Sequence, residues 1–159
     1  MTVWRLGIDL GGTKTEAVVL DANGAVCWRE RVATPKGTAE AICDGIAALA
    51  LRAEAAVHSR LTVGIGTPGS ISPQSGLLRG SNTVALNGKP VKQMLEQRLD
   101  REVRIANDAN CFALSEAVDG AGRGARCVFG AILGTGVGAG VVIGGKVLAG
   151  LHGIGGEWG

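Results

Sequence analysis

The distribution of glycine constrains this chain more than any other feature. The chain holds 27 glycines in 159 residues, and 15 of them lie in residues 120–159. They do not recur at every third position, which excludes a collagen-like triple helix. Because they are mixed with short runs of Val, Ile and Leu, they predict strands joined by tight turns whose backbone can approach a ligand closely.

Composition and charge narrow the classes of function. Lys and Arg number 16 against 14 Asp and Glu, so the net charge is +2, and aromatic residues make up only 3%. This balance disfavours a nucleic-acid or membrane-surface partner, and the lack of aromatics disfavours base stacking. The apolar runs are too short for a membrane span and the N-terminus lacks a signal-peptide pattern, so we expect a cytoplasmic protein.

The order of predicted elements indicates an α/β fold. We expect three strands, a long helix, a strand, a long loop with room for a small hairpin, a helix, a strand and a third helix, followed by three more strands. A glycine-rich break predicts a boundary between a first domain at 1–121 and the start of a second at 122–159. The expected elements span 4–10, 15–20, 25–33, 38–57, 61–66, 67–89, 90–99, 102–106, 109–119, 127–133, 139–144 and 145–151.

The first candidate motif is Asp-Leu-Gly-Gly-Thr-Lys, at the end of the first strand. Gly11 and Gly12 allow a tight turn that points N–H groups at an anion, and Thr13 and Lys14 add a hydroxyl and a positive charge. Asp9 is suited to hold a hydrated Mg²⁺. The motif is not a P-loop, because a strand follows it instead of a helix. A simple glycine hairpin with a turn-forming Asp is the alternative.

A second glycine motif, G-x-G-x-x-G at 64–69, resembles a dinucleotide-binding fingerprint. Pro68 and the Ser-Ile-Ser-Pro that follows cannot open the helix that such a site needs, and no acidic residue stands at the expected distance. We therefore expect a rigid loop that lines a cleft.

The pair Asn107-Asp108 lies between a predicted strand and a predicted helix. Asn and Asp are preferred helix caps, which is one interpretation. A carboxylate at the carboxyl end of a strand also suits a general base that takes a proton from a hydroxyl. The residues by themselves leave both roles open.

The sequence Leu-Gly-Thr-Gly-Val-Gly-Ala-Gly at 133–140 forms a further glycine turn between two predicted strands. Together with the turn near residues 11–13, it would clamp a polyphosphate from the opposite side.

The spacing of the four cysteines is not that of a zinc or redox site, and we therefore expect reduced, buried thiols. They are Cys27, Cys43, Cys111 and Cys127.

These motifs stand in an order that resembles the sugar-kinase branch of the ROK family, within the actin, hexokinase and Hsp70 superfamily. The resemblance covers the whole chain and includes Ala-Asn-Asp-Ala-Asn-Cys at 106–111 and the final Gly-Glu-Trp-Gly. It implies a ribonuclease-H-like (actin/hexokinase superfamily) N-terminal domain and the first strands of a truncated second domain. The segment 79–90 is most similar to bacterial fructokinases that also accept mannose.

The resemblance implies ATP-dependent phosphorylation of a hexose hydroxyl, with fructose expected first and mannose next, and N-acetylglucosamine or glucose as the alternative. Asp108 would act as the general base, and Asp9 would hold Mg²⁺ through water. The implied phosphate contacts are Asp9, Gly11, Gly12, Thr13, Lys14, Gly134, Thr135, Gly136 and Gly138. The implied sugar contacts are Gly69, Asn82, Asn107, Asp108 and Glu157.

The family pattern continues beyond Gly159 with a zinc-binding His and a cysteine motif that binds structural Zn²⁺, and these ligands are absent from this chain. We therefore expect residues 1–159 by themselves to be inactive as a kinase, and the complete protein to be a possible homodimer. A ROK repressor is disfavoured, because it needs a DNA-binding domain ahead of the strand that begins near Trp4. A non-catalytic sugar-binding fragment, or half of a split protein, is the alternative from another class.

Overall fold

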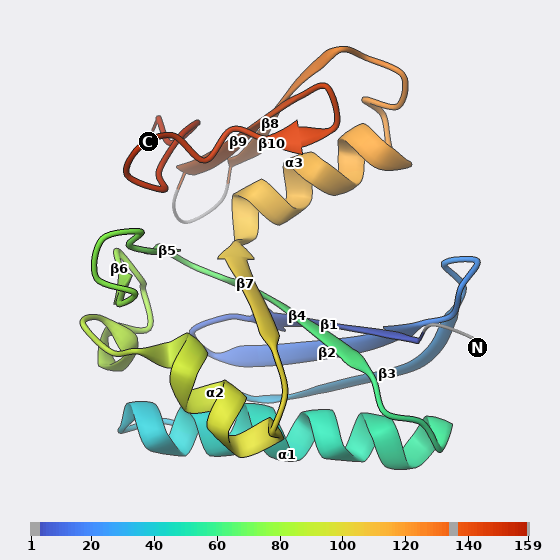
Figure 1. Cartoon of the computed structure of the whole chain (residues 1–159), viewed down its shortest axis with the longest axis vertical. Helices are drawn as coiled ribbons and strands as arrows, with labels where there is room; N and C mark the ends of the chain where they lie inside the picture. Colours follow the sequence, from blue (N-terminus) through green and yellow to red (C-terminus); the bar gives the residue numbers. More distant parts are fainter. Residues whose placement is uncertain (1–3, 134–136, 159) are drawn as a thin grey trace.

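The computed structural model describes residues 4–133 and 137–158, which form two layers of sheet with helices beneath and between them (Figure 1). The first sheet has the strand order β3-β2-β1-β4-β7. Strands β1 to β3 pair antiparallel, whereas β4 pairs parallel with both β1 and β7. Its elements are β1 (Arg5–Leu10), β2 (Lys14–Leu20), β3 (Val26–Ala33), α1 (Ala39–Val57), β4 (Thr62–Thr67), α2 (Val91–Leu99) and β7 (Val103–Asn107).

Exposed and buried residues alternate along β1, so every second side chain packs into the core. Leu6, Ile8 and Leu10 are buried, while the residues between them face the other side of the sheet. Helices α1 and α2 cover the buried side (Figure 1). Helix α1 begins where the hydroxyl of Thr38 accepts a hydrogen bond from Ala41 N. The predicted helix at 38–57 and the predicted meander are confirmed within one or two residues.

The long loop after β4 contains the small hairpin that the sequence allowed. It consists of β5 (Ser70–Ile71) and β6 (Leu78–Arg79), followed by the short 3₁₀ helix η1 (Val84–Leu86). Leu78 and Leu86 are fully buried against the first core. The loop is thus anchored at several points along its length.

The second layer consists of α3 (Asp108–Val118), β8 (Cys127–Leu133), β9 (Val137–Ile143) and β10 (Lys146–Val147), in the antiparallel order β10-β9-β8. The strand predicted at 145–151 is reduced to two residues. Gly144 and Gly145 both adopt positive φ and form the turn, and Gly150 also has positive φ, so the chain cannot continue as a strand there.

Helix α3 packs on β8 and β9 through glycines. A Cβ atom added at Gly130 would lie 2.9 Å from Ala113 Cβ, and one at Gly140 would lie 2.7 Å from Ala109 O. Helix α3 therefore covers one face of this sheet. The opposite face does expose apolar side chains, among them Leu133 at 75%. The domain boundary near residue 121 stays a prediction.

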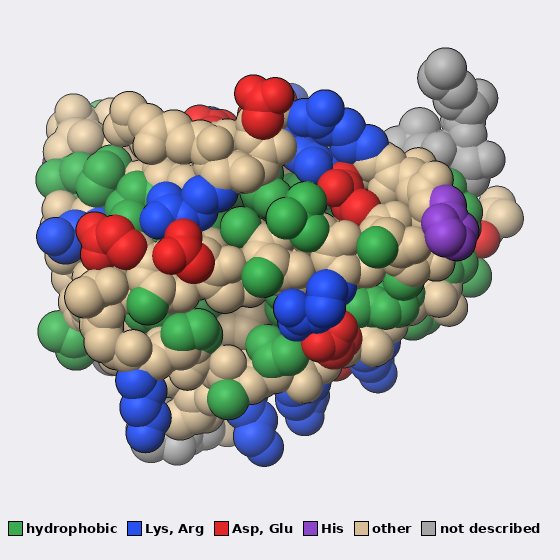
Figure 2. All heavy atoms as spheres, turned by 90° about the horizontal axis from the view of Figure 1, so that it is seen from below, with side chains coloured by type: hydrophobic (Ala, Val, Ile, Leu, Met, Phe, Trp, Pro, Cys, Tyr) green, Lys and Arg blue, Asp and Glu red, His purple; other side chains and the backbone are tan. Residues whose placement is uncertain are grey.

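On the face seen from below, acidic and basic side chains are interspersed with apolar ones, and several Lys and Arg side chains project along the lower edge of the view (Figure 2). No helix in the described part of the chain is long and apolar enough to cross a membrane.

Candidate active site

Asn107 caps the N-terminus of α3. Asn107 is buried and has extended backbone angles, and its side-chain oxygen accepts a hydrogen bond from Asn110 N at 3.1 Å. Its amide nitrogen donates to Gly69 O at 3.1 Å, which joins the end of β7 to the loop after β4. The helix cap is therefore Asn107, and Asp108 is the first helical residue. Among the described residues, the Asp108 carboxylate accepts only a local hydrogen bond, from Ala109 N at 2.8 Å.

Gly69 allows the backbone before β5 to lie close to the backbone after β6, near the start of α3. Its φ is +82°, and a Cβ atom there would lie 2.3 Å from Arg79 O and 2.8 Å from Ser81 N. No other residue fits, because both the backbone conformation and the space require glycine. The G-x-G-x-x-G segment thus ends in the tight loop that the sequence predicts.

All the residues predicted to contact the sugar line one cavity of about 670 Å³. The hairpin and its following loop form one wall, the start of α3 forms the floor, and the segment after β10 forms the other wall. The predicted residues in this cavity are Gly69, Asn82, Asn107, Asp108 and Glu157.

Arg79 lines the same cavity, although it belongs to none of the predicted contact residues. Its guanidinium donates to His152 O, and the amide of Gln74 lies 3.4 Å from His152 Nδ1. The hairpin of the first layer is therefore tied to the segment that carries Glu157. No pattern in the sequence indicates this contact, because the acceptor is a backbone carbonyl far along the chain.

A second cavity of about 780 Å³ lies against the face of the first sheet that α1 and α2 leave free. Gly7, Gly64 and Gly66 line the sheet side of this cavity, and Asp9 borders it at the end of β1. Asp108 lines both cavities. The structure thus places Asp108 at the junction of the cavity beside the hairpin and the cavity that contains Asp9.

Carboxylates dominate the electrostatics of this junction. Partial burial, with the charges of Asp108 and Glu16, raises the pKa of Asp9, while Arg31 opposes the shift. Burial raises the pKa of Glu157 as well, and the charge of Asp108 adds to it. Carboxylates that repel one another in this way are suited to a site that receives a cation or a proton.

The turn at Gly11–Lys14 closes through a hydrogen bond from Gly11 N to Lys14 O at 3.0 Å. Glycine is required at position 11, because a Cβ atom would lie 2.7 Å from Lys14 O. Gly11, Gly12, Thr13 and Lys14 line neither cavity. Gly134, Thr135 and Gly136 lie outside the described residues, and Gly138, predicted to contact phosphate, lines the sugar-side cavity.

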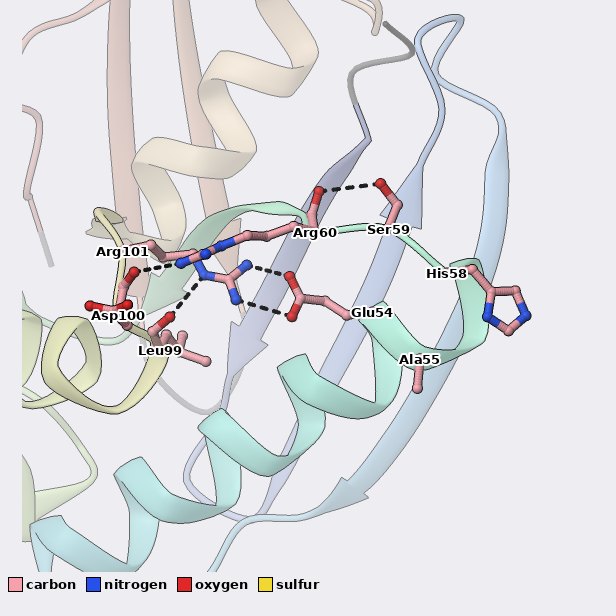
Figure 3. A pocket seen from close by; sticks show the side chains of 8 residues that line it. All are labelled: Glu54, Ala55, His58, Ser59, Arg60, Leu99, Asp100 and Arg101. Carbon is pink, nitrogen blue, oxygen red and sulfur yellow. Dashed lines mark hydrogen bonds and ion pairs between the residues drawn. The ribbon is translucent and has the colours of Figure 1, made fainter.

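Figure 3 shows a third depression, at the far end of the first layer, where α1 and α2 both end. The Arg101 guanidinium binds the Glu54 carboxylate and donates to the carbonyls of Leu61 and Leu99, at 2.9 and 3.1 Å. These contacts use most donors of Arg101 internally. The cluster therefore ties the two helix ends together and is not a candidate ligand site.

The expectation of buried thiols is correct only for Cys43. The other three cysteines are exposed, because Cys27 lies on an edge strand, Cys127 begins another edge strand and Cys111 borders the second cavity. Within residues 4–133 and 137–158, no group of three or more His, Cys, Asp or Glu side chains is arranged to hold a metal ion.

The chain is similar to N-acetyl-D-glucosamine kinases. It is 44% identical over 153 residues to that of Shigella boydii and 46% identical to that of Pectobacterium atrosepticum, covering 96% of this chain and 50% of each relative. The chain thus spans about half the length of the curated relatives it matches. These relatives do not support the expectation of a fructokinase.

Solved structures agree on the fold. A ROK family glucokinase from Streptomyces griseus, in complex with glucose and AMPPNP, superimposes with a TM-score of 0.86 at 36% identity, over 98% of this chain and 49% of that one. A ROK hexokinase from Thermus thermophilus gives 0.85 at 35% identity, over 98% and 52%. The α/β fold predicted from the motifs is confirmed. The ROK family model matches residues 5–159, and the chain therefore belongs to the ROK family.

Proposed function

We propose that this sequence forms part of the active site of an ATP-dependent sugar kinase, with the sugar in the cavity between the hairpin and the start of α3. One observation carries the proposal: the Asp108 carboxylate borders both this cavity and the one that contains Asp9. A group at such a junction can contact a sugar hydroxyl on one side and lie close to a phosphoryl donor on the other.

The role of Asp108 in this proposal is to take the proton of the attacking hydroxyl. Its carboxylate is oriented by Ala109 N, and the backbone beneath it is fixed by the hydrogen bond from Asn107 to Gly69 O. A base held on rigid elements costs little reorganisation when the hydroxyl attacks the terminal phosphate. Asn82 and Glu157 face the same cavity and are suited to orient the sugar through its other hydroxyls.

The residues present fit a nucleotide that carries Mg²⁺. Repulsion from Asp108 and Glu16 contributes to the raised pKa of Asp9, and a divalent cation would relieve that repulsion. Asp9 would hold the ion through water, since Mg²⁺ usually keeps several of its waters. When bound, the ion would neutralise charge on the transferred phosphoryl group.

We propose N-acetylglucosamine or glucose as the acceptor. This choice is supported by the names of the relatives, which are N-acetyl-D-glucosamine kinases at 44–46% identity and a glucokinase at 36%. A panel of N-acetylglucosamine, glucose, mannose and fructose, tested on the complete gene product that contains these residues, decides among them. Binding of a sugar without any turnover would favour a non-catalytic sugar-binding protein.

The substitution Asp108→Asn tests the proposed base. The amide keeps the shape of the carboxylate but accepts a proton poorly, so we expect kcat to fall by a factor of about 10²–10⁴ with sugar affinity retained. Asp119→Asn makes the same change at the other end of α3 and should leave kcat unchanged. Full activity of Asp108→Asn would place the base elsewhere.

A further inference from the structure

The residue after β3 makes two hydrogen bonds to the glycine turn between β1 and β2. Thr34 N donates to Thr13 O at 3.0 Å, and the Thr34 hydroxyl donates to Gly11 O at 2.7 Å. Thr34 is only 5% exposed. One buried residue therefore holds both ends of the three-residue segment from Gly11 to Thr13.

The direction of the hydroxyl hydrogen bonds follows from the partners. A hydroxyl has one proton, and Gly11 O can only accept, so the proton of Thr34 is used there. The contact of 2.9 Å between the hydroxyls of Thr15 and Thr34 must then have Thr15 as donor. Thr15 is 2% exposed, so the chain from Thr15 through Thr34 to Gly11 is shielded from water.

The backbone of Thr34 is itself held in place. Pro35 follows it, which restricts Thr34 to extended backbone conformations. Pro35 also packs against α1, since a Cβ atom added at Gly45 would lie 2.7 Å from Pro35 Cγ. The hydroxyl therefore projects from a fixed point and cannot follow the turn if the turn moves.

This anchoring sets the orientation of one peptide in the turn. The C=O and N–H of a trans peptide point in opposite directions, so drawing Gly11 C=O toward Thr34 turns the N–H of Gly12 away from it. Within the described part of the chain, the N–H of Gly12 has no hydrogen-bond partner. An N–H that a glycine turn leaves free is a donor for an anion.

We propose that Thr34 is a positioning residue that presents the N–H of Gly12 to a phosphate group of the nucleotide. The inference deepens the proposed kinase function and rests on it. Thr34 touches no substrate, and it acts through Gly11, whose carbonyl it holds. Loss of its hydroxyl should therefore weaken nucleotide binding and leave the sugar cavity unaffected, because Thr34 does not line that cavity.

Thr34→Val tests this inference in the complete gene product. Valine keeps the branched shape and the backbone N–H but removes the hydroxyl, so we expect KM for ATP to rise about five- to tenfold with the KM for sugar unchanged. Thr34→Ser restores the hydroxyl and should return KM for ATP to within about twofold of the wild-type value. Thr15→Val removes only the outer hydroxyl and should give a smaller rise.

Thr62→Val is the matched control. The Thr62 hydroxyl donates to Trp4 O at 3.3 Å at the other end of the sheet, so its loss should not change KM for ATP. An unchanged KM for ATP in Thr34→Val would overturn the inference. Equal losses for ATP and sugar, or no rescue by Thr34→Ser, would do the same, since either indicates a general loss of structure.

A readout that needs no turnover separates this inference from the kinase proposal. Binding of AMPPNP, measured by calorimetry, should weaken by the same factor in Thr34→Val, and bound AMPPNP should slow hydrogen exchange at the Gly12 amide less in Thr34→Val than in the wild-type protein. If the wild-type protein phosphorylates no sugar, yet Thr34→Val differs from it in both respects, the kinase proposal fails and the role of Thr34 in anion binding stands. If AMPPNP binds equally to both proteins, the inference about Thr34 fails.

Discussion

The contact between α3 and β9 gives the sharpest test of how the site is held in place. At Gly140, an added Cβ atom would lie 2.7 Å from Ala109 O and 2.9 Å from both Ala113 Cβ and Asn110 Cα. Ordinary contacts of this kind begin at 3.4 Å, so Gly140→Ala would require α3 to move by about 0.7 Å, the difference 3.4 − 2.7. Two of the obstructing atoms belong to backbone, which cannot rotate away.

Gly140→Ala should lower the free energy of unfolding, because overpacking a tight contact typically costs about 1–3 kcal/mol. For a chain of this size, each kcal/mol lowers the melting temperature by about 2–4 °C, so we expect a decrease of about 2–12 °C. The displaced carbonyl belongs to Ala109, next to Asp108, so kcat should fall as well. A misplacement of about 1 Å can cost as much as 10²-fold in rate, which gives the upper limit.

The assay is calorimetric unfolding together with steady-state kinetics on the complete gene product. Gly138→Ala is the matched control for stability, because Gly138 lies on the same strand and its added Cβ would meet Ala109 Cβ at 3.4 Å, an ordinary contact. Equal melting temperatures for Gly140→Ala and Gly138→Ala would refute the argument that backbone contact with α3 determines the cost.

Two further predictions concern the first layer. Arg101→Ala should lower the free energy of unfolding at pH 7 by about 1–3 kcal/mol. Its hydrogen bond to Glu54 lowers the pKa of that carboxyl below 4.5, so the difference from wild type should shrink in unfolding curves as the pH falls below 4.5 and Glu54 becomes protonated. Burial raises the pKa of Cys43 to about 11, so thiol titration of the folded protein at pH 8 should label Cys27 and Cys127 and leave Cys43 unlabelled until unfolding.

Local patterns predict the first layer well, because its elements bury one face each. The alternation in β1 and the apolar stripe of α1 follow from a single hydrophobic core, and Thr38, where the helix is predicted to begin, is its N-cap. The packing of α3 on the second sheet could not be predicted in the same way. Its contacts are made by glycines and alanines, which carry little hydrophobic periodicity.

In the candidate site, too, some features follow from sequence patterns and others do not. The resemblance to the ROK family supplied Gly69, Asn82, Asn107, Asp108 and Glu157, and these residues meet in one cavity although they are far apart in sequence. Hydrogen bonds to distant carbonyls, such as the one from Arg79 to His152, leave no motif in the chain. The sequence therefore predicts which residues line this cavity better than it predicts what holds them in position.

The position of Asn107 shows why the Asn-Asp pair can both cap the helix and supply a general base. The helix needs one cap, and Asn107 provides it while its amide also binds Gly69 O. Because the cap is a neutral amide, the next residue is free to carry a charge at the end of the helix where the dipole favours an anion. Asp108 thus lines two cavities, and the helix takes its cap from Asn107 instead. Replacing Asn107 should therefore damage stability first, whereas replacing Asp108 should damage turnover first.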